Sequence, residues 1–278
     1  MKAFRFSRFM SLLLILGLAG TGCATPERPD PWEPMNRGIF AFNETLDQYA
    51  LEPVATAWDF ILPGFVQTGL QNFFINLNTP IVLANNLLQA KPGAAIEDFA
   101  RFFHNTVFGL GGFIDVASEF EVPNNDEDFG QTLGYWGVPA GPYLMVPILG
   151  PYTLRDGIGE IIDTAASSYA YTTPFWYGVA NLNGVETVGA SIGVKGLELL
   201  NLRAIFLEEI DASRRDAFDY YIFIRNAYLQ NRRAKILDQT DTPVVDEADL
   251  YFYDEDDLED GEFEEDYDDD EEEDYDDL

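Results

Sequence analysis

The chain has 278 residues with 16 basic and 49 acidic side chains, one cysteine, one histidine and a formal net charge of −33. The charge is unevenly divided, because residues 246–278 hold 22 acidic and no basic residues, whereas residues 24–245 hold 27 acidic and 13 basic ones. No basic stripe is present to neutralise phosphates, which excludes nucleic acid as a partner. A lone cysteine and a lone histidine also exclude a disulfide within the chain and a His- or Cys-rich metal site.

Residues 1–22 have the pattern of a secretory signal peptide, with a basic start, an apolar run at 12–19 and small residues after it. The run is about half the ~20 residues that a membrane span needs. The small residues before Cys23 resemble the lipobox of bacterial lipoproteins, with Gly20 at a position where Leu is usual. This resemblance implies a lipid on Cys23, and Ala24 implies sorting to the outer membrane of a Gram-negative bacterium. The alternative is a plain signal peptide with a cysteine nearby by chance.

Composition divides the remaining chain into three parts. Residues 23–35 form a Pro-rich tether from the lipidated cysteine to the fold. Residues 36–240 are long enough for one domain with its own core. Residues 241–278 are predicted to be disordered, because like charges repel and little apolar surface is available for burial. This tail is either solvated, or it docks on a basic partner or loosely collects divalent cations.

Helical periodicity dominates residues 36–240, and no run of alternating strands is found, so we predict an all-α fold. The predicted helices span 36–51, 54–62, 65–77, 79–90, 94–107, 154–168, 185–200 and 213–237. Asn36 is expected to cap the first helix, and Pro53 to lie in the first turn of the second. Thr79 and Pro80 are expected to begin the fourth helix.

Two of these helices have clear apolar faces. Over 94–107, the apolar side chains expected to face inward are Ile96, Phe99, Phe102 and Phe103. Over 213–237, the apolar stripe consists of Phe218, Tyr221, Ile222, Tyr228 and Leu229, with Arg225, Arg232 and Arg233 on the polar side.

Two segments, 108–114 and 133–152, are apolar but interrupted by Gly and Pro, and neither is predicted as a helix or a strand. Loops normally run polar over the surface. Such apolar loops either pack inside the fold or line a lipid path or membrane surface.

No motif in the sequence builds a convincing active site. Residues 189–193 match G-x-S-x-G, but they lie in a helical pattern, whereas a nucleophile elbow needs a preceding strand. The lone His104 precedes this motif, opposite to the order in α/β-hydrolases, and is expected to be a hydrogen-bonded structural residue. Gly109 and Gly111 form only a G-x-G pattern, which is shorter than the glycine-rich fingerprint of a dinucleotide site and lacks the strand that should precede it.

Several motifs together resemble the MlaA/VacJ family of outer-membrane lipoproteins, over about residues 30–238. They include DPWEPMNR at 30–37, NFFINL at 72–77, GLGGFIDVA at 109–117, DFGQTLG at 128–134, GPYL at 141–144, LRD at 154–156 and Tyr228-Leu229. The acidic tail lies outside this resemblance.

The resemblance implies a ring of amphipathic helices in the inner leaflet of the outer membrane, with a central amphipathic channel. Such a protein removes mislocalised phospholipids from the outer leaflet and passes them to a periplasmic carrier of the Mla type, which maintains lipid asymmetry. Members sit beside trimeric porins and have no catalytic activity and no cofactor.

For such a channel we expect a set of small, polar and aromatic lining residues: Asn105, Gly109, Gly111, Gly112, Phe113 and Asp115. The loop 133–152 is a candidate gate, with Tyr135, Trp136, Gly141, Pro142 and Tyr143 as its residues. Two alternatives remain open. One is a structural lipoprotein that scaffolds porins or the wall, and the other is a phospholipase acting through Ser191.

Overall fold

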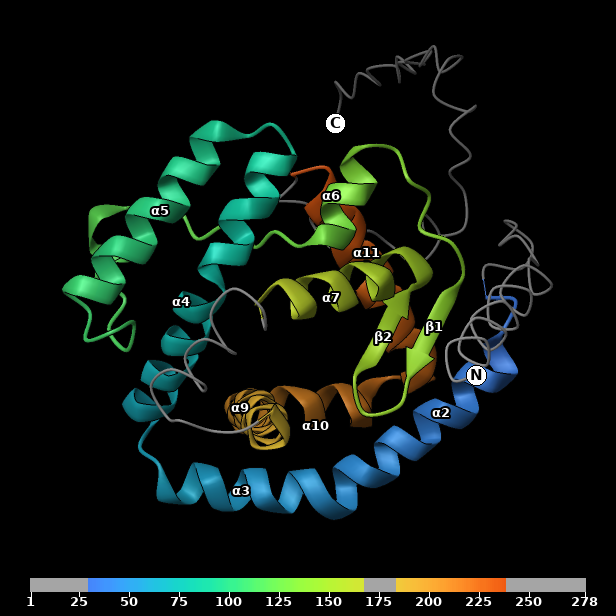
Figure 1. The fold of residues 1–278 in the computed structure, drawn as a ribbon. Coiled ribbons are helices and arrows are strands. Elements are labelled where there is room, and N and C mark those ends of the chain that lie inside the picture. Colours follow the sequence, from blue (N-terminus) through green and yellow to red (C-terminus); the bar gives the residue numbers. More distant parts are fainter. Residues whose placement is uncertain (1–29, 168–183, 239–278) are drawn as a thin grey trace, which may run out of the picture. The chain divides into compact units, whose positions relative to one another are not determined.

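The computed structural model describes residues 30–167 and 184–238, all within the first of two compact units, Met1–Thr242 and Pro243–Leu278. The signal peptide, Cys23 and the acidic tail lie outside the described residues. The part described is mostly helical (Figure 1). Its elements are α2 (Glu33–Leu46), η1 (Asp47–Leu51), α3 (Glu52–Ile61), α4 (Gly64–Leu88), α5 (Pro92–Val107), η2 (Ala117–Phe120), α6 (Phe129–Tyr135), β1 (Tyr143–Val146), β2 (Gly150–Thr153), α7 (Leu154–Ser167), α9 (Gly184–Ile205), α10 (Leu207–Asp216) and α11 (Tyr220–Ile236).

Helices α2 and α3 form one nearly continuous rod, joined by the π-helical turn η1. Pro53 lies in the first turn of α3, as predicted. Asn36 does not cap a helix, because α2 begins three residues earlier. Instead its buried amide donates to Asp30 Oδ1 and to the Tyr143 carbonyl, both at 3.0 Å, and accepts from Met145 N at 2.9 Å. Asn36 therefore joins the start of α2 to β1.

The two helices predicted over 65–77 and 79–90 are one helix, α4, with Pro80 inside it. The predicted break was wrong, although proline removes an N–H donor from the ladder. Thr79 lies inside the helix and donates from Oγ1 to the Ile75 carbonyl at 3.0 Å. Phe74, Ile81 and other residues of this helix are buried, and α4 packs along α5, so tertiary packing outweighs the local cost of the proline.

The segment 133–152 is more ordered than its composition indicated. Residues up to Tyr135 belong to α6, and β1 and β2 form an antiparallel hairpin in which Tyr143 pairs with Thr153 and Val146 with Gly150. The expectation of neither helix nor strand was therefore wrong. The hairpin turn explains the composition, since Gly150 has a φ of 91° that glycine adopts without strain.

The predicted helix over 213–237 is divided into α10 and α11, which meet at Ala217–Asp219. Asp219 caps α11 by accepting a hydrogen bond from Ile222 N at 3.2 Å. Phe218, expected in the apolar stripe, is fully exposed at this break. The rest of the stripe packs as predicted, with Tyr221 buried against Tyr143 and Met145 and with Ile222, Tyr228 and Leu229 around them.

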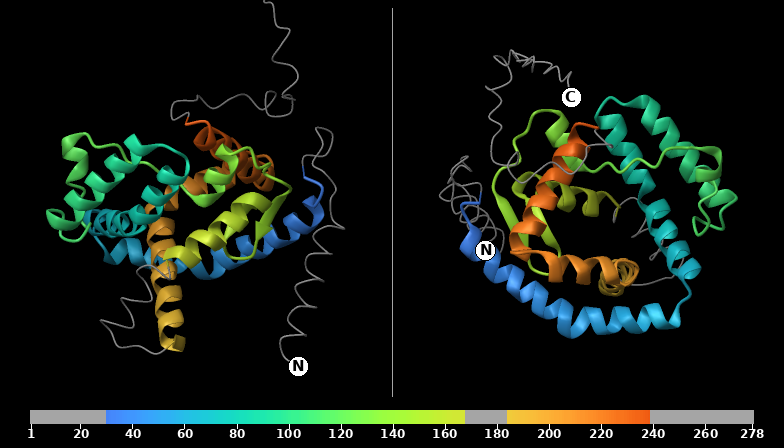
Figure 2. Two further views of the ribbon diagram at one scale, coloured as in Figure 1. Left: turned by 45° about the horizontal axis from the view of Figure 1, so that its top comes forward. Right: turned by 180° about the vertical axis from the view of Figure 1, so that it is seen from behind.

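Helix α9 runs crosswise to its neighbours. It is seen end-on between α3 and α10 in Figure 1 and along its length in the left view of Figure 2. It contacts both α3 and α4.

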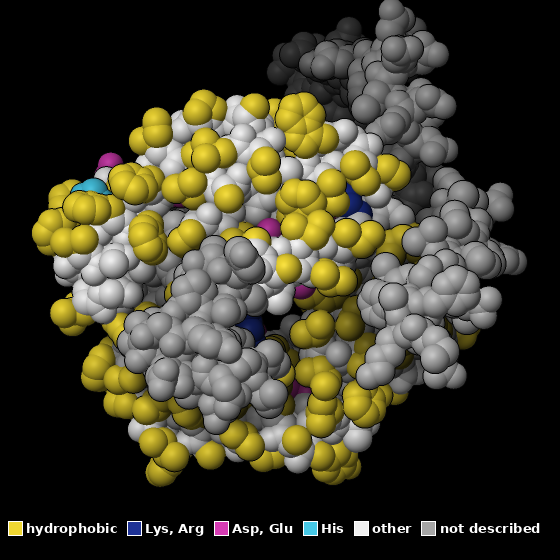
Figure 3. All heavy atoms as spheres, in the orientation of Figure 1, with side chains coloured by type: hydrophobic (Ala, Val, Ile, Leu, Met, Phe, Trp, Pro, Cys, Tyr) yellow, Lys and Arg dark blue, Asp and Glu magenta, His cyan; other side chains and the backbone are white. Residues whose placement is uncertain are grey.

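Many apolar side chains of the described residues face outward, while polar ones are buried. On α5, Ile96, Phe99 and Phe103 are exposed, whereas Asp98 and Arg101 are buried. Phe102 is half-buried, so the predicted inward face is wrong for three of its four residues. Hydrophobic side chains cover much of the face drawn in Figure 3. Over residues 30–167 and 184–238, none of the helices combines the length and the apolarity needed to cross a bilayer.

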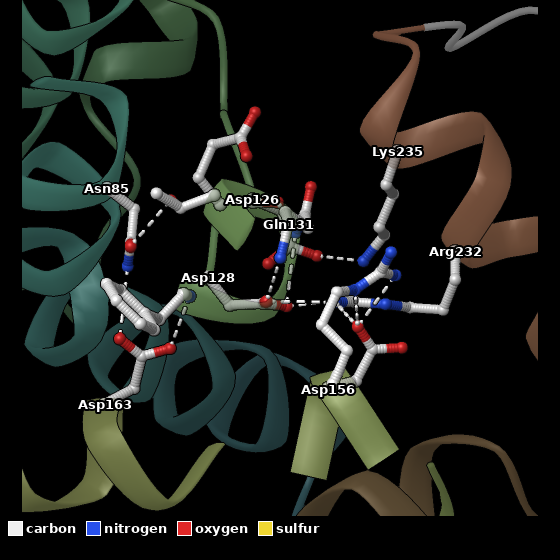
Figure 4. Close-up of polar contacts among 12 residues, drawn as sticks. Asn85, Asp126, Asp128, Gln131, Asp156, Asp163, Arg232 and Lys235 are labelled. Carbon is white, nitrogen blue, oxygen red and sulfur yellow. Dashed lines mark hydrogen bonds and ion pairs between the residues drawn. The ribbon is translucent and has the colours of Figure 1, made fainter. Parts of the chain in front are cut away.

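The polar interior is held by ion pairs between helices (Figure 4). Arg232 of α11, which was predicted on the polar side of its helix, binds Asp128 at the start of α6 and Asp156 of α7, the latter at 2.9 Å. Burial raises the pKa of each carboxyl, but the pairing with Arg232 lowers it by more. Both pKa values are therefore below the ordinary value. Beside them, Asp163 accepts from Phe129 N at 2.7 Å and from Asn85 Nδ2 at 3.2 Å.

Replacing Arg232 with Met is expected to lower the free energy of unfolding at pH 7 by about 2–3 kcal/mol, because Asp128 loses its cation. The lowered pKa values make Asp128 and Asp156 stabilising above about pH 4, and this contribution is lost as the pH falls through the folded-state pKa. Wild type should therefore lose more stability than the variant on acidification below about pH 4. Denaturant unfolding in mild detergent across this pH range measures both effects.

The matched control is Lys195→Met, which removes a cation from an exposed pair with Glu198. It should change stability by less than about 0.5 kcal/mol. Equal stabilities of Arg232→Met and wild type at pH 7 would contradict a stabilising role of this network.

Candidate functional site

A cavity of about 590 Å³ lies between the α2–α3 rod, the hairpin and helices α9, α10 and α11. Its lining residues are Phe40, Asn43, Glu44, Leu46, Asp47, Ala50, Leu51, Val54, Met145, Ile148, Gly150, Pro151, Gly196, Leu199, Leu200, Arg203, Ile210, Arg214, Tyr220 and Ile224. Most of these side chains are apolar, and the charged ones come from α2, η1, α9 and α10. In Figure 3 a hollow near the middle of the face exposes basic and acidic atoms among hydrophobic side chains.

Two arginines and their carboxylate partners form the charged edge of this cavity. Arg203 of α9 binds Asp47 at 2.9 Å and Glu52 at 3.1 Å. Arg214 of α10 binds Glu44 at 2.9 Å and Asp47 at 2.7 Å. Burial lowers the pKa of each guanidinium, but the carboxylates raise it by more. The net pKa is above the ordinary value, and both arginines remain charged. The cluster therefore ties α9 and α10 to the α2–α3 rod.

The π-helical turn η1 begins at Asp47, a carboxylate that binds both arginines. Short π-helical turns within α-helices occur frequently at functional sites, because the extra residue changes the direction of the side chains that follow. In this chain Tyr49, two residues on, is strongly exposed, while Ala50 and Leu51 line the cavity.

Asn43 of α2 holds the turn of the hairpin through two hydrogen bonds. Its Nδ2 donates to the Val146 carbonyl at 3.0 Å, and its Oδ1 accepts from Ile148 N at 2.8 Å. Both hydrogen bonds lie at the hairpin turn, where Ile148 and Gly150 line the cavity. One side chain therefore holds the edge of the hairpin that borders the cavity.

The residues expected to line a channel form a cluster at the end of α5 and in the turn that follows it, separate from the cavity. Asn105 and Asp115 are brought together, with a hydrogen bond of 3.0 Å, and Asp115 also binds Arg101. Burial raises the pKa of Asp115. Hydrogen bonds from Ser118 and Asn105 and the charge of Arg101 lower it by more, so the pKa is below the ordinary value. Phe113 stacks on Phe73 of α4 with ring centroids 5.0 Å apart. None of the six predicted channel residues is among those that line the cavity.

The glycines in this cluster form a tight turn against α4. Ile114 N donates to the Gly109 carbonyl at 2.9 Å, and Gly111 and Gly112 have positive φ values of 74° and 104°. A Cβ on Gly112 would lie 2.6 Å from Cβ of Asn76, so any larger residue would clash there. The absence of a side chain at Gly112 therefore permits close packing on α4.

The expected gate residues fall into two environments. Tyr135 and Trp136 are exposed at the end of α6, and Trp136 Nε1 donates to the Leu88 carbonyl at 3.0 Å. Gly141 and Pro142 precede β1, and Tyr143 is buried in the core against Tyr221. These five residues do not line the cavity, but 145–151 of the same segment contribute four lining residues.

The motifs considered for catalysis have structural explanations. His104 Nδ1 donates to the Ala100 carbonyl at 2.6 Å, which confirms a hydrogen-bonded structural histidine. Residues 189–193 lie inside helix α9, so the strand that a nucleophile elbow needs does not precede them. The charged edge of the cavity had no motif to reveal it. Asp47 lies far from Arg203 and Arg214 in the sequence, and no spacing between them indicated that they would meet.

Comparison with known proteins adds an independent line of support. A family model described as MlaA lipoprotein matches residues 28–235. The Intermembrane phospholipid transport system lipoprotein MlaA of Escherichia coli (strain K12) is 38% identical over 222 residues, which cover 78% of this chain and 82% of the relative. The protein of the same name from Haemophilus influenzae is 38% identical over 237 residues, covering 81% and 89%.

A solved structure is also similar. It is described as "Structural basis for maintenance of bacterial outer membrane lipid asymmetry" and has a TM-score of 0.64 and 37% sequence identity. The match covers 75% of this chain and 100% of that chain.

Replacing Gly112 with Ala is expected to lower the free energy of unfolding by about 2–4 kcal/mol, because the backbone is strained for L-residues and Cβ meets Asn76. The control is Gly38→Ala inside α2, where nothing lies within 4 Å of an added Cβ. That change should stabilise the protein by about 0.5–1 kcal/mol. Denaturant unfolding compares the two. Gly112→Ala with wild-type stability would disprove the close packing.

Proposed function

Because the chain belongs to the MlaA lipoprotein family, we propose that it transports phospholipids between the outer and inner membranes. The family is associated with the outer membrane of Gram-negative bacteria, and it is a family of lipid-transport lipoproteins rather than a known enzyme family. In this proposal the protein removes mislocalised phospholipids from the outer leaflet and so maintains lipid asymmetry.

The observation that carries this proposal is the cavity with apolar walls and one charged edge. A phospholipid has two apolar chains and a polar headgroup, so its path needs both kinds of surface. Leu51, Leu200 and Ile224 supply apolar wall, while Arg203 and Arg214 lie at the charged edge. We propose that the surrounding helices form a ring whose central channel includes this cavity.

The outward apolar side chains support a position within lipid. Phe60, Phe65 and Phe99 are mostly exposed, and exposed apolar patches of large extent mark contact with membranes or partner proteins. We propose that the helices lie in the inner leaflet of the outer membrane, with a lipid on Cys23 as an anchor on the periplasmic side. A trimeric porin beside the protein and a periplasmic carrier of the Mla type complete the proposed set of partners.

The group around Asn105 and Asp115 remains a second candidate for part of the lipid path, with 109–113 as its backbone wall. The segment 133–152 remains the candidate gate, now through its hairpin, because Ile148 and Gly150 border the cavity. The two locations are separable by substitution.

Mass spectrometry of lipids bound to the chain purified in mild detergent tests the function. Wild type should carry intact glycerophospholipid, and Leu200→Trp should reduce it at least about fivefold, because the indole fills the cavity. The control Ile192→Trp lies on an exposed part of the same helix, outside the cavity lining, and should retain wild-type binding. Wild-type binding in Leu200→Trp would contradict a lipid path through this cavity.

The same variants test transport in cells that lack the wild-type protein. Leu200→Trp should fail to restore lipid asymmetry and detergent resistance, whereas Ile192→Trp should restore both. Absence of bound phospholipid in every form would favour the alternative of a structural lipoprotein that scaffolds porins. Lysolipid or free fatty acid in place of intact lipid would favour a phospholipase.

A further inference from the structure

The charged edge of the cavity carries an excess of negative charge. Two guanidiniums, Arg203 and Arg214, face four carboxylates, so the cluster has a net charge of −2. Of the four carboxylates, Glu44 and Asp47 line the cavity, whereas Glu52 and Asp211 bind the same two arginines without lining it, so the excess belongs to the ion cluster as a whole. A partly enclosed site with such an excess attracts cations and repels anions.

Glu44 has hydrogen-bonding capacity beyond its ion pair. An ionised carboxylate accepts at about four positions. Arg214 is the cation that Glu44 pairs with, and the Glu44 side chain is 22% exposed where it lines the cavity. A cationic donor that enters the cavity can therefore reach Glu44 without displacing Arg214.

Donor capacity for an anionic group is present beside these acceptors. The Arg203 side chain lines the cavity and is only 4% exposed, yet its Nη1 has no hydrogen-bond partner among the described residues. A buried guanidinium N–H without a partner is costly, so a side-chain movement that exposes it to a ligand oxygen in the cavity would relieve that cost. Arg214, partly exposed in the same cavity, supplies a second cation.

We propose that this edge of the cavity is a headgroup site that selects zwitterionic phospholipids with a primary ammonium group over anionic phospholipids. The ammonium donates to Glu44, the phosphate accepts from Arg203 and Arg214, and an acyl chain lies against the apolar wall. The inference rests on the proposed function, because it names the lipid class that the transport cavity takes.

Physical chemistry ranks the common headgroups at such a site. Ethanolamine brings three N–H donors with its positive charge, which the spare acceptor positions of Glu44 satisfy. Choline brings the same charge without donors. Glycerol brings no positive charge, so its phosphate enters a cluster whose net charge is already negative. The expected order of binding is phosphatidylethanolamine, then phosphatidylcholine, then phosphatidylglycerol.

The test is competitive binding to the full purified lipoprotein in mild detergent. The protein is equilibrated with equal amounts of phosphatidylethanolamine and phosphatidylglycerol with the same acyl chains, and the bound lipids are quantified by mass spectrometry. Wild type should bind phosphatidylethanolamine in about three- to tenfold excess, as expected for one charge interaction at an effective dielectric constant near 20 after partial desolvation. A second mixture, with phosphatidylcholine, tests the contribution of the N–H donors.

Glu44→Gln should bring the ratio of the two bound lipids close to one, because it removes one negative charge and keeps an acceptor for Arg214. The matched control is Glu33→Gln, on the same helix, which removes a carboxylate paired with Arg37 but does not line the cavity. It should leave the ratio unchanged.

Each outcome has a distinct meaning. Phospholipid bound to wild type without headgroup preference would overturn the headgroup site and leave the proposed transport function intact. Absence of bound phospholipid would overturn both. An equal shift in Glu33→Gln and Glu44→Gln would show that the selectivity arises from net charge and not from the cavity. The measurement on wild type needs no variant, so the proposal remains testable even when Glu44→Gln fails to fold.

Discussion

Charged groups in the interior must be paired, and this requirement determines how the helices are joined. An unpaired buried charge costs several kcal/mol. Arg101 binds Asp115 and the Val122 carbonyl, which joins α5 to the chain that follows it. Arg203 joins α9 to the α2–α3 rod, and Arg232 joins α11 to α6 and α7. The planar guanidinium suits this role, because one side chain donates to two elements in fixed directions.

The polar interior leaves many large apolar side chains on the surface of the described residues. Because amides and ion pairs occupy much of the buried volume, large apolar side chains such as Phe60, Phe65 and Ile96 remain exposed. In water this arrangement would forgo much of the hydrophobic stabilisation that folding normally gains. In acyl chains the same surface needs no protein partner. The arrangement is thus consistent with a lipoprotein whose cargo and surroundings are both lipids.

The sequence predicted the helical class and most helix positions, because periodicity shows which residues share a face. It did not show whether that face points inward, and on α5 the buried side includes Asp98 and Arg101 rather than Phe99. The Pro80 break was wrong because packing on α5 outweighs propensity. The cavity was not predicted, since Asp47 and Arg203 meet only through tertiary contacts across 156 positions. The motif-rich segment 109–117 instead forms a close-packed turn.

Two sides of the cavity are attached to the α2–α3 rod by interactions of different strength. This difference determines which side a passing lipid would displace. The side formed by α9 and α10 is tied to the rod by an ion cluster in which Asp47 and Glu52 each bind both Arg203 and Arg214. The hairpin turn is tied to α2 through the two hydrogen bonds of Asn43. Neutral hydrogen bonds are worth about 0.5–1.5 kcal/mol each, whereas bonds between charged groups are worth more. A lipid that displaces a wall should therefore move the hairpin turn first, while the charged edge stays in place for the headgroup.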